Sequence, residues 1–171
     1  MIKLNLGCGQ DYKRGYINID SNKNIEAEIH CDLSKKIPFK NNSVDEVYCK
    51  NMFEHIPEPL KFLLEIKRIL KNGGKAIIIT SNGSYILYHF PRKRAYHDTY
   101  NLSSLPGDKH YFFFQKGHLV AFTDKVEMKL KKLEYYIADA RKSKNRLAQI
   151  ILGAIFGKKF GYSDFLWVLE K

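Results

Sequence analysis

The chain has 171 residues, 44% of them hydrophobic, and a formal net charge of +11. This length suits one domain with a single core. Cys8, Cys31 and Cys49 show neither Cys-x-x-Cys spacing nor paired histidines, which argues against a zinc or disulfide framework and favours a cytoplasmic location. No metal site or secretory signal is predicted, and the longest apolar run, about ten residues, is too short to span a bilayer.

The first twenty residues predict a ligand site. A strand-like run, Met1 to Leu6, ends in Gly7-Cys-Gly9, and a second run, Tyr16 to Ile19, ends in Asp20. Glycines allow a ligand to approach the backbone closely, although any tight turn after a strand needs them too. An acid after the second strand can accept hydrogen bonds from a ribose diol. The pattern therefore favours a ligand that contains a nucleoside.

The connection between these two strands argues against a dinucleotide. Tyr12 stands where the third glycine of the dinucleotide fingerprint belongs. The segment from Gln10 to Gly15 is too short for a full crossover helix, whose positive end a pyrophosphate needs. A ligand without phosphates does not need that helix.

Alternating elements follow in the first half of the chain. We predict strands over Glu26 to Asp32, Val44 to Cys49 and Lys75 to Thr80. Pro59 to Asn72 has the apolar spacing of a helix, with Gly73 and Gly74 after it as its stop. Its predicted buried stripe consists of Leu60, Leu63, Leu64, Ile66, Ile69 and Leu70. This alternation indicates an α/β doubly wound sheet, with its ligand at the carboxyl ends of the strands.

The second half is less regular. We predict a basic helix over Gln115 to Lys132, an edge strand over Leu133 to Ile137 and a closing strand over Phe165 to Leu169. Between them, Arg146 to Lys159 carries apolar residues at helical spacing: Leu147, Ile150, Ile151, Ala154 and Ile155.

Five ordered blocks in the first eighty residues resemble class I S-adenosylmethionine (SAM)-dependent methyltransferases of the compact type 11 branch. They begin with Leu4-Asn-Leu-Gly-Cys-Gly9 and Gly15-Tyr-Ile-Asn-Ile-Asp20, and they end with Phe53-Glu-His-Ile-Pro57 and Leu64-Glu-Ile-Lys-Arg-Ile-Leu-Lys-Asn-Gly-Gly74. The resemblance implies a Rossmann-like, mostly parallel seven-stranded sheet with an antiparallel last strand and a reduced first crossover helix. It also implies SAM as cofactor and S-adenosylhomocysteine as product.

The resemblance assigns the cofactor site residue by residue. Asp20 corresponds to the ribose-binding acid, Asp32 to the acceptor of the adenine amine, and Leu33 to an apolar wall of the ring. Alternatively, Asp32 only caps the turn Asp32-Leu-Ser34. The expected cofactor-binding residues are Leu6, Gly7, Cys8, Gly9, Asp20, Ser21, Asp32, Leu33, Asn51, Met52 and His55.

Methyl transfer requires alignment of the acceptor and, for a hydroxyl, removal of a proton. His55 and His110 are the candidate bases, because an imidazole suits this work near neutral pH. His110 and Phe114 match a His-x-x-x-Phe element of the family, whose loop closes over the substrate. His55 instead packs at the helix entry under the alternative interpretation. Glu54 is a candidate to orient His55, but a carboxylate at a helix start needs no such role.

Basic clusters concentrate in the second half, at Arg92 to Arg94, Lys129 to Lys132, Arg141 to Arg146 and Lys158-Lys159. They fit an RNA-binding surface or an ordinary solvated one. The apolar stripe beside them fits a helix lying on an anionic membrane. It equally fits a helix packed on the sheet or in a homodimer interface.

These observations predict one methyltransferase domain over residues 1–171, with a cofactor half at 1–83 and a substrate-side half at 84–171. The expected acceptor is a hydroxyl, or an amine, of a small molecule or of a glycan or lipid-linked compound. We place it between the Asn51-to-Pro57 loop and a Tyr96-to-Phe114 lid. The alternatives are an RNA methyltransferase and a basic nucleic-acid-binding module without catalysis. The expected location is cytoplasmic, with peripheral contact to membranes as an option.

Overall fold

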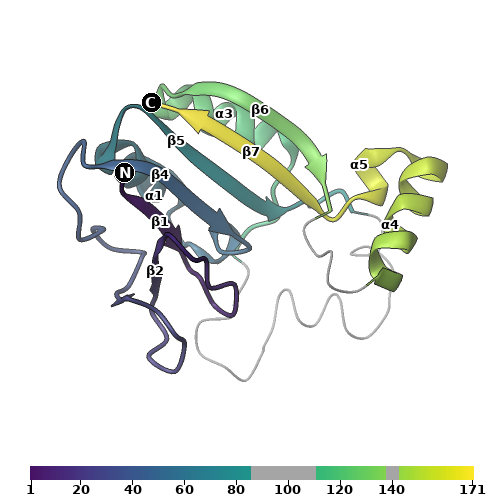
Figure 1. Ribbon diagram of the computed structural model, residues 1–171. Coiled ribbons are helices and arrows are strands. Elements are labelled where there is room, and N and C mark those ends of the chain that lie inside the picture. The colour runs from purple at the N-terminus through teal and green to yellow at the C-terminus, as the bar shows by residue number, and fades with distance from the viewer. Residues whose placement is uncertain (86–110, 138–142) are drawn as a thin grey trace.

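A computed structural model describes residues 1–85, 111–137 and 143–171, with the side chains of 143–145 left out of the description. Its centre is a seven-stranded sheet of order β3-β2-β1-β4-β5-β7-β6 (Figure 1). The strands are β1 (Lys3–Leu6), β2 (Ile17–Asp20), β3 (Ile29–His30), β4 (Val44–Lys50), β5 (Leu70–Ser81), β6 (Lys129–Tyr136) and β7 (Asp164–Glu170). Strands β1 to β5 are mutually parallel, whereas β7 lies antiparallel between β5 and β6. The predicted α/β sheet with an antiparallel last strand is confirmed.

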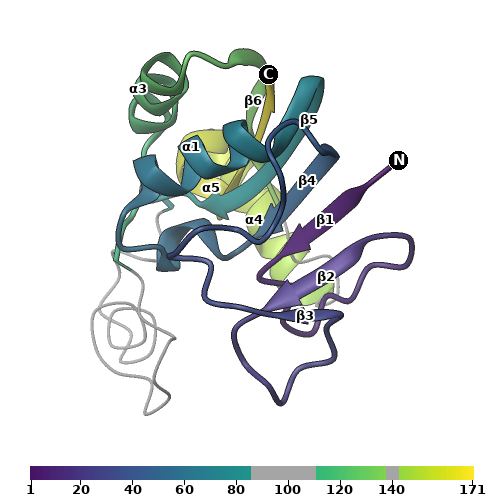
Figure 2. The same cartoon turned by 90° about the vertical axis from the view of Figure 1, so that its left-hand side faces the viewer.

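Helices α1 (Pro59–Ile69) and α3 (Lys116–Val126) contact each other on one face of the sheet (Figure 2). Burial alternates along the strands as a result. In β7, the side chains of Phe165, Trp167 and Leu169 are almost fully buried, whereas Leu166 and Val168 are only half-buried. The core therefore lies between the sheet and these two helices.

The boundary between α1 and β5 corrects the sequence prediction. The helix ends at Ile69 rather than Asn72, and the strand starts at Leu70 rather than Lys75. Leu70 takes an extended conformation and pairs with Val44 of β4. The two glycines do not stop the helix; they lie within β5, where Gly73 has φ +79°. Pairing with neighbouring strands outweighs the local helical pattern here.

The buried face of α1 also differs from the predicted stripe. Phe62, Leu63, Ile66 and Ile69 are buried, but Leu60 and Leu64 are 36% and 46% exposed. Pro59 begins the helix, as expected from its preset φ angle.

Two further boundaries were predicted wrongly. The helix expected up to Lys132 ends at Val126, where Glu127 takes a left-handed conformation, and the basic run Lys129 to Lys132 belongs to β6. This run pairs with β7 at the edge of the sheet, and Lys131 forms an ion pair with Glu170 at 3.4 Å. The strand expected over Glu26 to Asp32 is reduced to β3, which leaves Asp32 in the turn that follows.

The connection from β1 to β2 contains no helix, which confirms the reduced crossover. Two buried asparagines hold it instead. The side-chain amide of Asn5 donates through Nδ2 to the Asp11 carbonyl (2.8 Å) and to Asn18 Oδ1 (2.8 Å). Asn18 Oδ1 accepts from the Lys13 amide (2.8 Å), and its Nδ2 donates to the Lys13 and Tyr16 carbonyls (both 3.2 Å). Side-chain amides thus satisfy backbone groups that a helix would otherwise satisfy.

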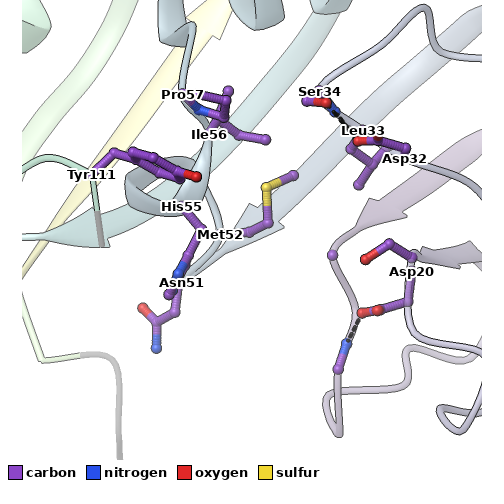
Figure 3. Close-up of a pocket in the computed structure, with 13 residues that line it drawn as sticks. Asp20, Asp32, Leu33, Ser34, Asn51, Met52, His55, Ile56, Pro57 and Tyr111 are labelled. Atoms are coloured by element: carbon purple, nitrogen blue, oxygen red, sulfur yellow. Dashed lines mark hydrogen bonds between the residues drawn. The ribbon is translucent and has the colours of Figure 1, made fainter. Parts of the chain in front are cut away.

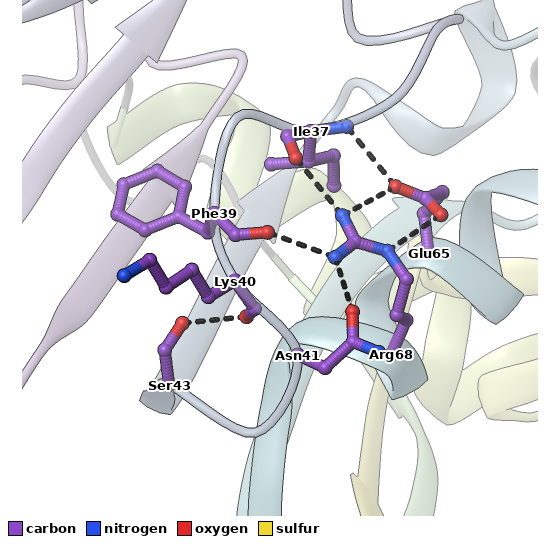
Figure 4. Close-up of polar contacts among 7 residues, drawn as sticks. All are labelled: Ile37, Phe39, Lys40, Asn41, Ser43, Glu65 and Arg68. Carbon is purple, nitrogen blue, oxygen red and sulfur yellow. Dashed lines mark hydrogen bonds and ion pairs between the residues drawn. The ribbon is translucent and has the colours of Figure 1, made fainter.

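A single guanidinium holds the loop between β3 and β4 (Figure 4). Arg68 of α1 donates to the carbonyls of Ile37 (2.9 Å) and Phe39 (2.8 Å) and to Asn41 Oδ1 (2.8 Å). It also pairs with both carboxylate oxygens of Glu65 (2.8 Å each), and Glu65 accepts the Ile37 amide at 3.1 Å. The loop is thereby fastened to the helix that covers the sheet.

Candidate functional site

A cavity of about 450 Å³ opens at the carboxyl ends of the parallel strands (Figure 3). This volume lies within the range of about 300–1,000 Å³ that is usual for small-molecule sites. Asp20 and Asp32 lie on one side, while His55 and Tyr111 lie on the other, with Met52 between them. The lining residues are Gly7, Gly9, Asp20, Ser21, Asp32, Leu33, Ser34, Asn51, Met52, His55, Ile56, Pro57 and Tyr111.

The loop after β1 and the end of β2 form one wall. Gly7 has φ +65°, and a Cβ there would lie 2.3 Å from Cγ of Met52, so only glycine fits. The Gly9 amide donates to Asp20 Oδ2 (2.8 Å), and the Asn22 amide donates to Oδ1 (2.9 Å). Because a carboxylate can accept about four hydrogen bonds, Asp20 keeps acceptor capacity toward the cavity.

Asp32 caps its own turn and also lines the cavity. Its Oδ1 accepts from the Ser34 amide (2.9 Å) and hydroxyl (2.6 Å). These bonds hold the pKa of Asp32 below its usual value, because they stabilise the charged form. The neighbouring Leu33 is buried and lines the same wall. Asp32 therefore caps the turn, as one interpretation expected, and it also places a carboxylate beside an apolar surface of the cavity.

The segment after β4 forms the opposite wall. Asn51 takes a left-handed conformation (φ 49°), and its amide donates to the Ile79 carbonyl at 2.8 Å. The short helix η1 (Phe53–His55) follows. The fully buried Phe53 ring stacks on Phe114 with 4.9 Å between centroids and meets Trp167 edge-on at 5.7 Å. This packing fixes the turn that carries Met52 and His55.

Glu54 fastens the same turn to the end of β5. Its carboxylate is 1% exposed and accepts from the Thr80 (2.9 Å) and Ser81 (2.7 Å) hydroxyls. Its carbonyl accepts the Tyr111 amide at 2.8 Å. The buried carboxylate is thus satisfied by neighbouring hydroxyls, and Glu54 as a whole holds the wall of the cavity that carries His55 and Tyr111. Glu54 is a positioning residue for the turn.

The structure brings together nine of the residues expected to bind the cofactor. The two others, Leu6 and Cys8, are buried and do not line the cavity. The candidate base His110 lies outside the described residues, as does most of the expected lid. Ser34 and Tyr111 line the cavity without having been singled out. The Asp-x-Ser pattern at Asp32 to Ser34 is a sequence signal by which Ser34 could have been found. Tyr111 belongs to a segment distant in sequence, and no local pattern indicates its position.

The three cysteines are free thiols. Cys8 and Cys49 are buried, and Cys31 is half-buried. Burial raises the pKa of Cys8 to about 11, with the charge of Asp20 adding to the effect. Burial likewise raises the pKa of Cys49, which lies wholly in the core. Such thiols act as small apolar side chains.

In the described parts of the chain, no helix combines the length and hydrophobicity needed to cross a membrane.

Comparison with known proteins agrees with this geometry. A family described as a methyltransferase domain matches residues 8–78. An uncharacterised protein of Methanocaldococcus jannaschii is 39% identical over 92 residues, which are 46% of this chain and 40% of that protein. A ubiquinone biosynthesis O-methyltransferase of Xanthomonas oryzae is 26% identical over 111 residues, which are 64% of this chain and 45% of that protein. The chain thus spans less than half the length of these relatives.

The fold is shared over nearly the whole chain. A SAM-dependent methyltransferase from Mesorhizobium loti superposes with a TM-score of 0.68 at 12% identity, covering 99% of this chain and 90% of that one. The family match and the shared fold together confirm the resemblance seen in the sequence. Residues 8–78 therefore match a methyltransferase-domain family, and the chain shares the fold of SAM-dependent methyltransferases.

Proposed function

We propose that this chain transfers a methyl group from SAM to a hydroxyl of a small-molecule or lipid-linked acceptor. The observation that carries the proposal is the cavity itself, where two carboxylates at the carboxyl edge face a histidine and a tyrosine. Several relatives are named as O-methyltransferases, which favours oxygen as the acceptor atom.

The cofactor half of the cavity fits a nucleoside. We assign the ribose diol to the open acceptor positions of Asp20 and the adenine amine to Asp32, with Leu33 against the ring. Gly7 and Gly9 let the ligand approach the backbone, because no Cβ occupies that wall. Every group in this assignment lines the same cavity.

The acceptor half lies beyond Met52. Bound SAM supplies an electrophilic methyl group on a sulfonium. Ile56, Pro57 and Tyr111 form an apolar wall that holds the acceptor body and excludes water. His55 stands at the same wall and receives the hydroxyl proton in this proposal. Glu54 and Phe53 keep the turn in place, so that the imidazole meets the acceptor in one orientation.

Calorimetric titration with SAM and S-adenosylhomocysteine tests the cofactor site. We expect Asp20→Asn to weaken binding of both by about tenfold or more, because hydrogen bonds to a carboxylate contribute roughly 1.5–3 kcal/mol each. The matched control, Asp124→Asn, changes an exposed carboxylate of α3 and leaves binding unchanged. Undetectable binding to the folded wild-type protein would refute the cofactor assignment.

Transfer of radiolabelled methyl groups to phenolic, sugar and RNA acceptors tests the reaction. With an accepted substrate, we expect His55→Gln to lower kcat by about 100-fold or more, as for loss of a general base, while the Kd for SAM stays constant. His30→Gln, an exposed histidine at the end of β3, is the control. A fall in SAM affinity with an unchanged kcat would instead give His55 a cofactor-binding role. Methylation of RNA alone would replace the proposed acceptor class.

A further inference from the structure

A helical hairpin at the carboxyl end of the sheet exposes an unusual apolar surface. It consists of α4 (Ser143–Phe156) and α5 (Lys158–Gly161), and it projects from the end toward which β4 and β5 run (Figure 1). We call its exposed apolar side chains the hairpin face: Leu147 (60% exposed), Ile150 (43%), Ile151 (49%), Ile155 (65%), Phe156 (49%) and Phe160 (42%). Exposed apolar side chains gathered on one short element in this way are typical of an interaction site.

Close backbone packing and buried hydrogen bonds hold the hairpin in place. A methyl group added at Gly161 would lie 2.1 Å from the Gly153 nitrogen, so the two helices touch through their backbones. Gln149, the buried polar residue of α4, accepts the Ser163 amide at 3.1 Å. Asn82, fully buried just after β5, donates to the carbonyls of Lys159 (2.8 Å) and Tyr162 (2.7 Å).

These contacts decide which side of α4 faces outward. Gln149 and Gly153 occupy the side against α5, so Leu147, Ile151 and Ile155 are left on the opposite side. Among the described elements, the main packing partner of α4 is α5, not the sheet. The described residues therefore do not support the interpretation of Arg146 to Lys159 as a helix packed on the sheet.

The charge around the hairpin face has a single sign. Residues 143–163 contain Lys144, Arg146, Lys158 and Lys159 and no aspartate or glutamate. The described basic residues Arg146, Lys158 and Lys159 are all exposed, and the Lys159 ammonium lies 5.2 Å from the centre of the Phe160 ring. Apolar side chains bordered by lysine and arginine are typical of helices that lie in the interface of an anionic bilayer.

We propose that the hairpin face docks this protein on the surface of a membrane that contains anionic lipids. At about 1.5 Å per residue, the 14 residues of α4 measure about 21 Å, so the helix lies along the surface rather than across the bilayer. A symmetric contact between two copies would bring the same basic patches together, which like-charge repulsion disfavours. An anionic lipid surface offers both the apolar layer and the opposite charge.

The docking surface goes beyond the proposed methyl transfer and does not depend on it. Asn82 nevertheless joins the hairpin to the end of β5, next to Thr80 and Ser81, whose hydroxyls hold Glu54 of the cavity wall. The docked protein thus presents to the lipid surface the sheet edge that carries the cavity. An acceptor with a lipid tail would meet the site from there.

Vesicle flotation tests the apolar contribution. We expect the wild-type protein to float with vesicles of phosphatidylcholine and phosphatidylglycerol. Ile151→Gln/Ile155→Gln should lower its partition coefficient by about tenfold or more, because two apolar side chains no longer insert into the lipid. The control, Leu64→Gln/Val120→Gln, makes the same neutral changes at exposed positions of α1 and α3 and keeps wild-type partitioning. All four side chains are exposed, so the melting temperatures should stay within a few degrees of wild type.

Charge reversal tests the lipid class. Lys158→Glu/Lys159→Glu should weaken partitioning by about tenfold or more, because basic residues near an anionic lipid surface are attracted to it and the introduced carboxylates are repelled. Lys125→Glu/Lys129→Glu changes the net charge equally at exposed positions away from the hairpin and should have a much smaller effect. Binding of the wild type to pure phosphatidylcholine vesicles should be weak.

Two results would overturn the proposal. One is equal flotation of the wild type and the isoleucine variant. The other is dimerisation of the wild type in sedimentation velocity, lost in the isoleucine variant, with no flotation of either. The second result would identify the hairpin face as a contact between copies. Because SAM binding is measured separately, failure of docking leaves the assignment of the cavity standing.

Discussion

Two connections between parallel neighbouring strands are stabilised in different ways, one by apolar packing and the other by hydrogen bonds. From β4 to β5 the chain uses α1, which buries Phe62, Leu63, Ile66 and Ile69 against the sheet. From β1 to β2 it uses a bare loop, held by the buried amides of Asn5 and Asn18. Both connections return the chain to a parallel neighbour of the starting strand.

The difference follows from what each connection must do. An apolar helix face gains free energy in proportion to the area it buries, so α1 contributes much of the stability of the core. A network of side-chain amides gains less but sets positions tightly, because each hydrogen bond requires one direction. The loop held in this way carries Gly7 and Gly9 at the cavity. The first connection therefore mainly stabilises the fold, and the second mainly shapes the ligand site.

The largest expected effect comes from breaking the apolar connection. Leu63→Ala should lower the free energy of unfolding by about 2–5 kcal/mol, as for other leucines in cores, since Leu63 is fully buried. The exposed Leu64→Ala should change it little. Chemical denaturation measures both. We expect SAM affinity of the folded Leu63 variant to match wild type, and a selective loss of affinity would contradict the division of labour.

Breaking the polar connection should have a smaller effect on stability and a larger one on the ligand. Asn18→Ala leaves the Lys13 amide and the Lys13 and Tyr16 carbonyls without their partner, at a cost of about 1–3 kcal/mol. Calorimetry should show weaker SAM binding as well, because the glycine loop loses its support. Asn24→Ala, at an exposed position, is the control. Unchanged SAM affinity in the Asn18 variant would separate the network from the site.

The smallest effect is expected where α1 meets the loop after β3. Arg68 holds the pKa of Glu65 below its ordinary value of 4.5, so the ion pair stabilises the fold at neutral pH and this contribution is lost as pH falls through the lowered pKa. Glu65→Gln should cost about 1 kcal/mol at pH 7. The gap to wild type should close on acidification below about pH 4.5. A gap independent of pH would mean that packing, not charge, fastens the loop.

Much of the site could be predicted because its residues lie at the carboxyl ends of strands that the sequence pattern indicates. Gly7 and Asn51 follow β1 and β4, and Asp20 ends β2; these strands are parallel neighbours, so the three residues converge at one edge of the sheet. The contribution of Tyr111 could not be predicted in this way. It reaches the cavity through a hydrogen bond to Glu54, 57 residues earlier in the chain, and no local pattern encodes such a contact.

The amino-acid sequence by itself determined the order of strands and helices, the glycine turn, the acid after the second strand and the absence of a full first crossover helix. These depend on local backbone preferences and on the spacing of apolar residues. Only the tertiary structure decided where α1 yields to β5, how Glu54 is satisfied in the core, and which side of α4 is left exposed. These depend on partners distant in sequence, because pairing across the sheet and contact between helices outweigh local propensity.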